Sequence, residues 1–398
     1  MFVKKIALLA FVCLVMIVTG CGGGSSTSGA SGPDTGSKQP TTIGKTAIAG
    51  SGWYPRVIRL SHGPAAYNGR LIASTGVGGN ISPGASAHGV FQSLDSGATF
   101  SPLGSVVAAA GSSERCCSTL FELPVAVGTL PAGTLLSAGS YNSGTTPAIE
   151  VYISKDEGET WSYYDTPAIR GAGKKGGLWE PEFSIASDGA LVMFWSDETD
   201  PCCSQKIVQI RTYDGHTWQD MSNTVALLAA DARPGMARVS TLPNGHHFMS
   251  YEVCGSQQQC TAYSRTSTDG WNYGTPSTLG NRIVSSTGQY FEHAPDSVWT
   301  RAGGGNGALL AVGQMLYEAD GTVSPSNGRV LFVNTSADGA GVWTVKPAPV
   351  PVPNAYSNPC PNYADTLLPS ADGAELLELA ADFNGSMGCQ TYYGTLPQ

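Results

Sequence analysis

A short sequence pattern recurs five times along the chain, and it limits the possible folds more than any other feature. Two full copies, residues 93–100 and 154–161, have the form S-x-D-x-G-x-T-aromatic, and three shorter copies follow. The aspartates of the five copies are Asp95, Asp156, Asp214, Asp269 and Asp338. They span 243 residues in four steps, so the mean period is about 61 residues. A period of this length indicates repeated supersecondary units.

The pattern itself has a structural cause. Aspartate and serine side chains bond backbone groups within a tight turn, and glycine adopts a backbone conformation that other residues avoid. Such a turn suits the hairpin between two strands, and the aromatic residue then packs beneath it. The copies resemble the Asp-boxes of sialidase-like β-propellers, in which we expect them to be structural rather than functional.

The segments between the copies have the features of short strands. Residues 71–75, 148–153, 190–195 and 330–333 are apolar and partly alternating. The chain contains 51 glycines and 25 prolines among 398 residues, which argues against a helical bundle. Residues 48–398 hold just under six periods. The sequence therefore predicts an all-β fold, a six-bladed β-propeller with four-stranded blades, as one domain.

The N-terminal residues 1–20 have the features of a signal peptide rather than of a fold. Lys4 and Lys5 precede thirteen apolar residues, a run too short to span a bilayer permanently. The run ends in Val-Thr-Gly before Cys21, which resembles a bacterial lipobox. The resemblance implies cleavage before Cys21 and lipidation of its thiol. An ordinary signal peptide with a chance cysteine is the alternative.

Residues 21–47 are rich in glycine, serine, threonine and proline, and we interpret them as a lipidated cysteine followed by a flexible tether. The sequence therefore predicts an exported protein that is lipid-anchored to the cell envelope. Gly22 follows the lipidated cysteine, and by the bacterial sorting rule this implies the outer membrane in a Gram-negative host. The formal net charge of −9 argues against a nucleic-acid partner. We expect a monomer.

The cysteine count agrees with export. Of ten cysteines, Cys13 lies in the signal peptide and Cys21 carries lipid, which leaves an even number for disulfides. We expect one local pair, one pair within the last segment, and pairing of the two Cys-Cys dipeptides with each other. The expected sets are Cys254–Cys260, Cys360–Cys389, and Cys116/Cys117 with Cys202/Cys203. A metal site is the weaker alternative, because no CxxC occurs and no histidine lies at ligand spacing.

The candidate chemistry rests on carboxylates. The sequence has no G-x-S-x-G, P-loop, HExxH or convincing dinucleotide fingerprint. Glu180 stands between Trp179 and Pro181, and Glu252 follows an apolar strand segment and Tyr251. Carboxylates in such apolar surroundings need partners or a task. A structural salt bridge is the alternative for either glutamate alone.

An ordered set of short motifs resembles glycoside hydrolase family 93, which comprises exo-acting α-L-arabinofuranosidases that trim arabinan. The motifs cover the body of the chain from about residue 50, and the 72 residues between Glu180 and Glu252 match the spacing expected for the family's catalytic pair. The resemblance implies a six-bladed propeller and a retaining mechanism. The motifs are Tyr54-Pro55-Arg56, Trp179-Glu180-Pro181, Arg233-Pro-Gly-Met with Tyr251-Glu252, and residues 363–370.

The resemblance also implies roles for single residues. Glu252 would be the nucleophile and Glu180 the general acid/base, with carboxyl groups about 5–5.5 Å apart as a retaining glycosidase requires. Arg56 and Arg233 would line the pocket and bond sugar hydroxyls or orient a carboxylate. Tyr363 would hydrogen-bond the nucleophile. This chemistry needs neither a cofactor nor a metal.

Several alternatives stay open. Glu182 would point to the same side as Glu180 in an extended strand, so either could be the acid/base, and the motif favours Glu180.

A non-catalytic propeller that binds glycan or assists assembly is the second hypothesis, because fold does not fix function. A sialidase is the third. Adjacent strand residues such as Tyr251 and Glu252 face opposite sides, which counts against a joined sialidase nucleophile. The Cys-Cys pairs depart from the family and make arabinan specificity less secure.

Overall fold

The computed structural model describes residues 44–76 and 87–398. The predicted signal peptide, Cys21 and most of the predicted tether lie outside these described residues. The described chain is almost entirely β-structure, with one short 3-10 turn at Ala65–Tyr67. Among the residues described, no helix is long and apolar enough to cross a membrane.

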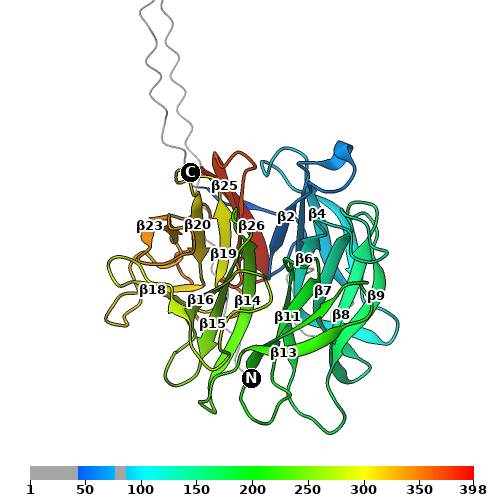
Figure 1. The fold of residues 1–398 in the computed structure, drawn as a ribbon. Helices are drawn as coiled ribbons and strands as arrows, with labels where there is room; N and C mark the ends of the chain where they lie inside the picture. Colours follow the sequence, from blue (N-terminus) through cyan, green and yellow to red (C-terminus); the bar gives the residue numbers. More distant parts are fainter. Residues whose placement is uncertain (1–43, 77–86) are drawn as a thin grey trace, which may run out of the picture. The chain divides into compact units, whose positions relative to one another are not determined.

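The strands form six antiparallel sheets, which are the blades of a propeller (Figure 1). The first blade contains β2 (Arg56–Arg59), β3 (Leu71–Gly76), β4 (Ala87–Ser93) and β5 (Ser101–Val107). The second contains β6 (Ser112–Glu122), β7 (Leu135–Ser143), β8 (Thr146–Ser154) and β9 (Ser162–Ile169). The third contains β10 (Leu178–Ile185), β11 (Leu191–Asp197), β12 (Lys206–Thr212) and β13 (Gln219–Val225).

The remaining blades include the only departure from four strands within the described residues. The fourth contains β14 (Arg233–Thr241), β15 (His247–Cys254) and β16 (Thr261–Ser267), and its sheet extends through β17 (Asn281–Arg282), β18 (Tyr290–Glu292) and β21 (Met315–Tyr317). The fifth contains β19 (Asp296–Thr300), β20 (Ala308–Val312), β22 (Val330–Asn334) and β23 (Thr344–Pro347). The sixth contains β24 (Thr366–Pro369), β25 (Glu375–Phe383), β26 (Cys389–Pro397) and β1 (Thr46–Ala47). The six-bladed all-β prediction is confirmed.

Two features close the ring. The innermost strands of the six blades contact one another in sequence, and β2 of the first blade also contacts β24 of the last. In addition, β1 pairs with β26, so both ends of the described chain lie in one sheet. Strand β1 lies at the end of the predicted tether, so the propeller begins two residues before the predicted boundary at residue 48.

The recurring turns all lie at the same place in their blades, between the third and fourth strands. In the first, Ser93 Oγ accepts the Gly97 N–H at 2.8 Å, and Asp95 Oδ1 accepts the Thr99 N–H at 2.9 Å. The sixth blade has no such turn, because its third and fourth strands, β26 and β1, come from opposite ends of the described chain and no hairpin joins them. This explains why five copies of the pattern accompany six blades.

Apolar layers fill the spaces between neighbouring blades. Phe183 and Trp195 belong to the layer between the second and third blades, and Phe194 and Tyr251 to the layer between the third and fourth. Such packing follows from strands with apolar residues on both faces, each face covered by the next blade. Side chains near the propeller axis are therefore left to form the site.

The structure corrects one of the expected disulfide pairings. Cys254–Cys260 and Cys360–Cys389 are joined as expected. The two Cys-Cys dipeptides do not pair with each other: Cys116 is bonded to Cys117, and Cys202 to Cys203. The expectation was wrong because Cys117 lies on the innermost strand β6 near the axis, whereas Cys202 lies in the loop after β11 of the next blade.

Candidate active site

Six residues with left-handed backbone conformation surround the propeller axis, one for each blade. Each precedes or interrupts the innermost strand of its blade, and the residue two positions later lies on that strand. The six residues are Tyr54, Cys117, Glu180, Met236, Ala294 and Ala364. Five of the six belong to one apolar cluster, which Trp53 and Tyr363 extend. The sixth is Glu180, so a single carboxylate interrupts this otherwise apolar ring.

A β-bulge separates the two candidate acids on β10. The pairing of β10 with β11 shifts register between Trp179 and Glu182, and Glu180 has a φ of 52°. The two glutamates therefore do not share the direction that an extended strand would give them. The bulge is the physical reason why the ambiguity left by the sequence is resolved in the structure.

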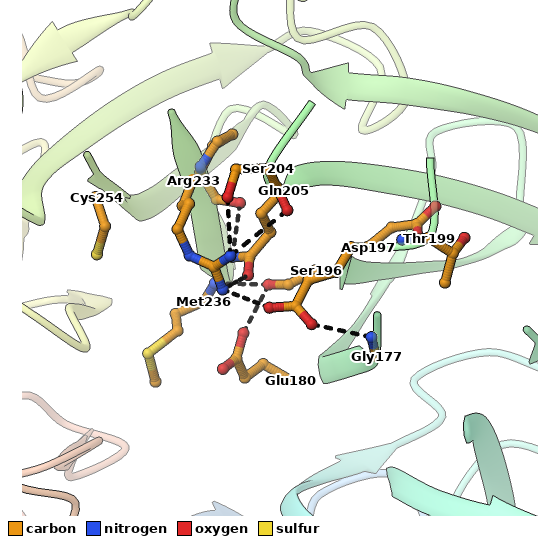
Figure 2. Close-up of polar contacts among 12 residues, drawn as sticks. Gly177, Glu180, Ser196, Asp197, Thr199, Ser204, Gln205, Arg233, Met236 and Cys254 are labelled. Carbon is orange, nitrogen blue, oxygen red and sulfur yellow. Dashed lines mark hydrogen bonds and ion pairs between the residues drawn. The ribbon is translucent and has the colours of Figure 1, made fainter. Parts of the chain in front are cut away.

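Glu180 is half-buried and bonded to the second strand of its own blade. Its Oε2 accepts the hydroxyl of Ser196 at 2.6 Å, and Ser196 Oγ accepts the Met236 N–H at 3.2 Å (Figure 2). Burial raises the pKa of Glu180, and the Ser196 hydrogen bond opposes that rise. A carboxyl group with a raised pKa is suited to hold a proton for transfer.

Glu182 is fully engaged in a buried ionic network. It forms an ion pair with Arg238, and its Oε2 accepts the Thr119 hydroxyl at 3.0 Å. Arg238 Nε in turn donates to Asp296 Oδ1 at 2.9 Å. These four residues lie on the innermost strands of four successive blades. The network ties the blades together, so Glu182 has a structural role and is not free to act as an acid/base.

Glu252 lies on β15, the second strand of the fourth blade, and still reaches the site. It is 8% exposed, and its Oε2 accepts the Ala294 N–H at 2.7 Å. Its partner on the inner strand β14 is Gly235, which has no side chain to cover it. Tyr251 points the opposite way into the layer between blades, as alternation along the strand predicts.

Gly235 allows several groups to approach closely. A Cβ atom at this position would lie 2.4 Å from Gln205 Nε2 and 2.9 Å from Ser196 Oγ. It would also lie 3.6 Å from Glu180 Oε2. The glycine of the Arg-Pro-Gly-Met motif is therefore required by the side chains around it.

The two glutamates interact electrostatically. Burial, and then the nearby charge of Glu180, raise the pKa of Glu252 to about 8. Burial lowers the pKa of His293, whose Nδ1 lies 4.0 Å from Glu252 Oε2. Two carboxyl groups whose charges interact hold one proton between them at pH values between the two macroscopic pKa values of the pair. The pair can thus present one acid and one carboxylate at the same time.

Arg233 is held in a fixed position beside the pair. Its guanidinium donates to Ser204 Oγ at 3.0 Å and to Gln205 Oε1 at 2.7 Å (Figure 2). It also forms an ion pair with Glu198. The charge of Arg233 lowers the pKa values of both Glu180 and Glu252, against the larger effect of burial. Arg233 side-chain atoms are 39% exposed, so the group remains open to a ligand.

The structure places Arg56 and Tyr363 at the axis, with contacts that differ from those expected. Arg56 is 4% exposed; it donates to the Ala364 carbonyl at 2.9 Å and lies over the Tyr54 ring. It lines a small cavity together with Glu180. The Tyr363 hydroxyl donates to Met236 Sδ at 3.5 Å rather than to Glu252. The charges of both Glu252 and Glu180 help raise the pKa of Tyr363, after burial.

Sequence reasoning did not identify Ser196, Glu198, Arg238 or Asp296. A signal for part of this set was present in the sequence, because three inner strands share one order of residues. In each, a left-handed residue is followed by proline and then by a charged residue. These triplets are Tyr54-Pro55-Arg56, Glu180-Pro181-Glu182 and Ala294-Pro295-Asp296. Ser196 and Glu198 carry no such signal, since their role depends on the pairing of β10 with β11.

One group of potential metal ligands meets within the described part of the chain. It consists of Cys254, Cys260 and His293. The two cysteines are joined to each other, and a disulfide does not offer the thiolates that such a metal site needs. The residues present therefore do not fit a metal.

Comparison with known proteins finds similar solved structures. No protein-family model matches this chain, and no curated protein matches it. Among solved structures, an α-L-arabinanase of Penicillium chrysogenum, complexed with arabinobiose, is 28% identical. The match covers 88% of this chain and 94% of that one, with a TM-score of 0.71.

A second solved structure is the family 93 α-L-arabinofuranosidase of Fusarium graminearum with arabinobiose. It is 26% identical over 90% of this chain and 95% of that one, with a TM-score of 0.70. A structure of a Fusarium graminearum α-L-arabinofuranosidase with an iminosugar inhibitor is 25% identical, covering 88% and 94%, with a TM-score of 0.71.

A microbial sialidase shares the fold alone, at 13% identity and a TM-score of 0.56 over 87% of this chain and 66% of that one. The arabinan-degrading enzymes are therefore the informative neighbours, and their similarity supports a glycoside hydrolase. The resemblance to glycoside hydrolase family 93 that the sequence predicts is confirmed in the structure.

Proposed function

We propose that the protein is an exo-acting glycoside hydrolase that cleaves α-L-arabinofuranosyl linkages in an arabinan-like polysaccharide. One observation carries the proposal: Glu180 and Glu252 lie together at the axis with raised pKa values, and each responds to charge around the same pocket. Solved structures similar to this chain include an arabinanase and an arabinofuranosidase bound to arabinobiose or an inhibitor, which supports the proposal.

The proposed reaction retains the anomeric configuration. Glu252 as a carboxylate attacks the anomeric carbon, while Glu180 gives its proton to the departing glycosidic oxygen. Glu180 then takes a proton from water, which hydrolyses the glycosyl-enzyme ester. The Ala294 N–H donates to Glu252 Oε2 and fixes the orientation of that carboxyl. Arg233 is the residue best placed to bond sugar hydroxyls.

The test follows products from linear arabinan, with a sialoside as the comparison substrate. The proposal predicts arabinofuranosyl products whose first-formed anomer, observed by proton NMR, is the α-anomer of the substrate. Binding of arabinan without cleavage would replace the proposal with a glycan-binding propeller. Cleavage of the sialoside alone would replace it with a sialidase.

We also propose that the protein is anchored to the bacterial envelope through lipid on Cys21. The lipobox-like segment supports this, since several acyl chains together anchor a protein stably. Metabolic labelling with a palmitate analogue tests it. Label should enter the wild-type protein and be lost in Cys21→Ser, and label-free wild-type protein would contradict it.

A further inference from the structure

Ser196 is the one hydroxyl in direct contact with Glu180 among the hydrogen bonds of the described residues. It lies on β11, is 1% exposed, and places Oγ 2.6 Å from Glu180 Oε2. The same Oγ accepts the Met236 N–H at 3.2 Å. A hydroxyl has one hydrogen and two lone pairs. Because the backbone N–H occupies a lone pair of Ser196, its own hydrogen is free for the carboxylate.

The surroundings hold Ser196 in this orientation. Met236 N belongs to the left-handed turn on β14, at a φ of 56°. Gly235 next to it leaves the space that Ser196 Oγ occupies, since a Cβ there would lie only 2.9 Å away. Three strands of two blades thus converge on one hydroxyl: β10 supplies the carboxyl, β11 the serine and β14 the N–H.

We propose that Ser196 is a positioning residue that keeps Glu180 Oε2 as a hydrogen-bond acceptor, so that Oε1 is the oxygen that carries the transferable proton. The proposal rests on the proposed function and deepens it. In the first step the Oε1–H bond breaks and its proton forms the O–H of the leaving sugar, while the negative charge stays on Glu180. Ser196 stabilises that charge at Oε2. In the second step water returns a proton to Oε1.

Other charged and titratable groups act on Glu180 as well. Glu198 raises its pKa, Arg233 lowers it, and Glu252, Tyr54 and Tyr363 respond to its charge. None of these groups is removed by a change at Ser196. A shift on replacing Ser196 therefore reports the lost hydroxyl, provided that Arg233 keeps its position.

The experiment measures the titration of Glu180 directly in the purified full-length protein. Glutamate labelled with ¹³C at the side-chain carboxyl gives one signal per residue, and Glu180→Gln identifies the Glu180 signal by its loss. Ser196→Ala, Ser196→Thr and the control Ser137→Ala are then compared with wild type. Ser137 is also a buried serine on a second strand, and it bonds His88 rather than a carboxyl group.

In Ser196→Ala we expect the Glu180 midpoint to rise by about one pH unit, a tenfold change in its acid dissociation constant, because a hydrogen bond to the charged form is lost. Ser196→Thr should restore the wild-type midpoint, and Ser137→Ala should leave it unchanged. A Glu180 midpoint in Ser196→Ala equal to that of wild type would overturn the proposal.

Kinetics add a second arm. With arabinan, Ser196→Ala should lower kcat more than it changes KM and should move the alkaline limb of the pH profile upward. If neither wild type nor variants cleave arabinan, the proposed function fails. The carboxyl titration still decides whether Ser196 holds Glu180, so the two failures can be told apart.

Discussion

At the scale of single residues, Glu180 and Glu252 differ from ordinary surface glutamates in what surrounds them. Glu252 is nearly buried, and its Oε2 accepts the Ala294 N–H and lies 4.0 Å from His293 Nδ1. Glu180 faces a serine hydroxyl and the charges of Arg233 and Glu198. A carboxyl group that is buried without enough opposite charge beside it favours its neutral, protonated form. Such a pair is unfavourable for folding and useful for proton transfer.

The pair predicts a bell-shaped pH dependence of kcat/KM. The productive state carries one proton on the pair. Above about pH 8, the upper titration of the interacting pair, both groups are ionised and Glu180 has no proton to give. The acid limb, where both groups are protonated and Glu252 cannot attack, should lie above the ordinary glutamate value of 4.5, because burial raises the pKa values of both. Arabinan hydrolysis from pH 4 to pH 10 checks this, and an alkaline limb below pH 6 would contradict it.

Glu252→Gln should stabilise the protein in alkali. The pKa of this buried group rises from 4.5 to about 8 on folding, so the folded state binds the proton more tightly. Wild-type stability from this group is therefore highest below pH 4.5 and falls as the pH rises to about 8. The variant removes that loss, with a gain of at most about 5 kcal/mol at pH 8.5. Urea unfolding at pH 5 and pH 8.5 measures it. An equal effect at both pH values would count against a raised pKa.

At the scale of elements, the site is built by one irregularity repeated in each inner strand. Five of the six left-handed residues pack together in one cluster, and in each blade the residue two positions later lies on the innermost strand. In the third blade the left-handed residue is Glu180, and the residue two positions later is Glu182, which forms an ion pair with Arg238. The same local geometry therefore supplies both a reacting group and a structural one.

Gly235→Ala should disturb two blades at once. The added methyl would meet Gln205 Nε2 and Ser196 Oγ at distances shorter than ordinary contact. We expect a loss of about 1–3 kcal/mol in the free energy of unfolding and a reduced kcat/KM. Gly305→Ala is the matched control, because a Cβ there meets no atom within 4 Å. Equal behaviour of the two variants in urea and in activity assays would show that the close approach at Gly235 is unimportant.

The ionic network beneath the pocket should matter for stability. Replacing Arg238 by Met leaves the buried carboxylates of Glu182 and Asp296 without their shared partner, which should cost about 3–5 kcal/mol. Arg211→Met removes exposed ion pairs and should cost no more than about 1 kcal/mol. Denaturant unfolding compares the two variants. A loss for Arg238→Met no larger than for Arg211→Met would mean that the network does not hold the blades together.

At the scale of the whole molecule, the ring is closed by pairing the two ends of the described chain. Strand β1 completes the sixth blade beside β26, and Ile48 after it is buried against Leu377, Leu379 and Tyr393. Closure covers the apolar sheet faces that the first and last blades of an open array would expose to water. It also fixes the distances among residues that come from different blades, including Glu180 and Glu252.

Much of this architecture could be predicted from the sequence, since the turn pattern repeats and its chemistry is local. The period indicated the number of blades, and the predicted strands at 71–75, 148–153, 190–195 and 330–333 correspond to β3, β8, β11 and β22. The short strands β17, β18 and β21 were not predictable in this way. They are two or three residues long and form only through pairing at the outer side of the fourth blade.

The candidate site could be predicted only in part. The motifs pointed to Glu180 and Glu252, and the structure brings both to the axis with Arg56, Arg233 and Tyr363. The bulge that separates Glu180 from Glu182 depends on the register with β11, and the vicinal disulfides depend on where β6 and β11 lie in the ring. Such contacts between distant segments leave no local mark in a sequence.

The central claim is that Glu252 and Glu180 divide the chemistry between nucleophile and acid/base. The most direct measurement compares wild type, Glu180→Gln and Glu252→Gln on arabinan and on 2,4-dinitrophenyl α-L-arabinofuranoside, whose leaving group needs no proton. Glu180→Gln should lower arabinan cleavage by about 10²- to 10⁴-fold and still release a burst of dinitrophenolate. Glu252→Gln should lose both activities. Wild-type rates for Glu252→Gln on either substrate would contradict the account.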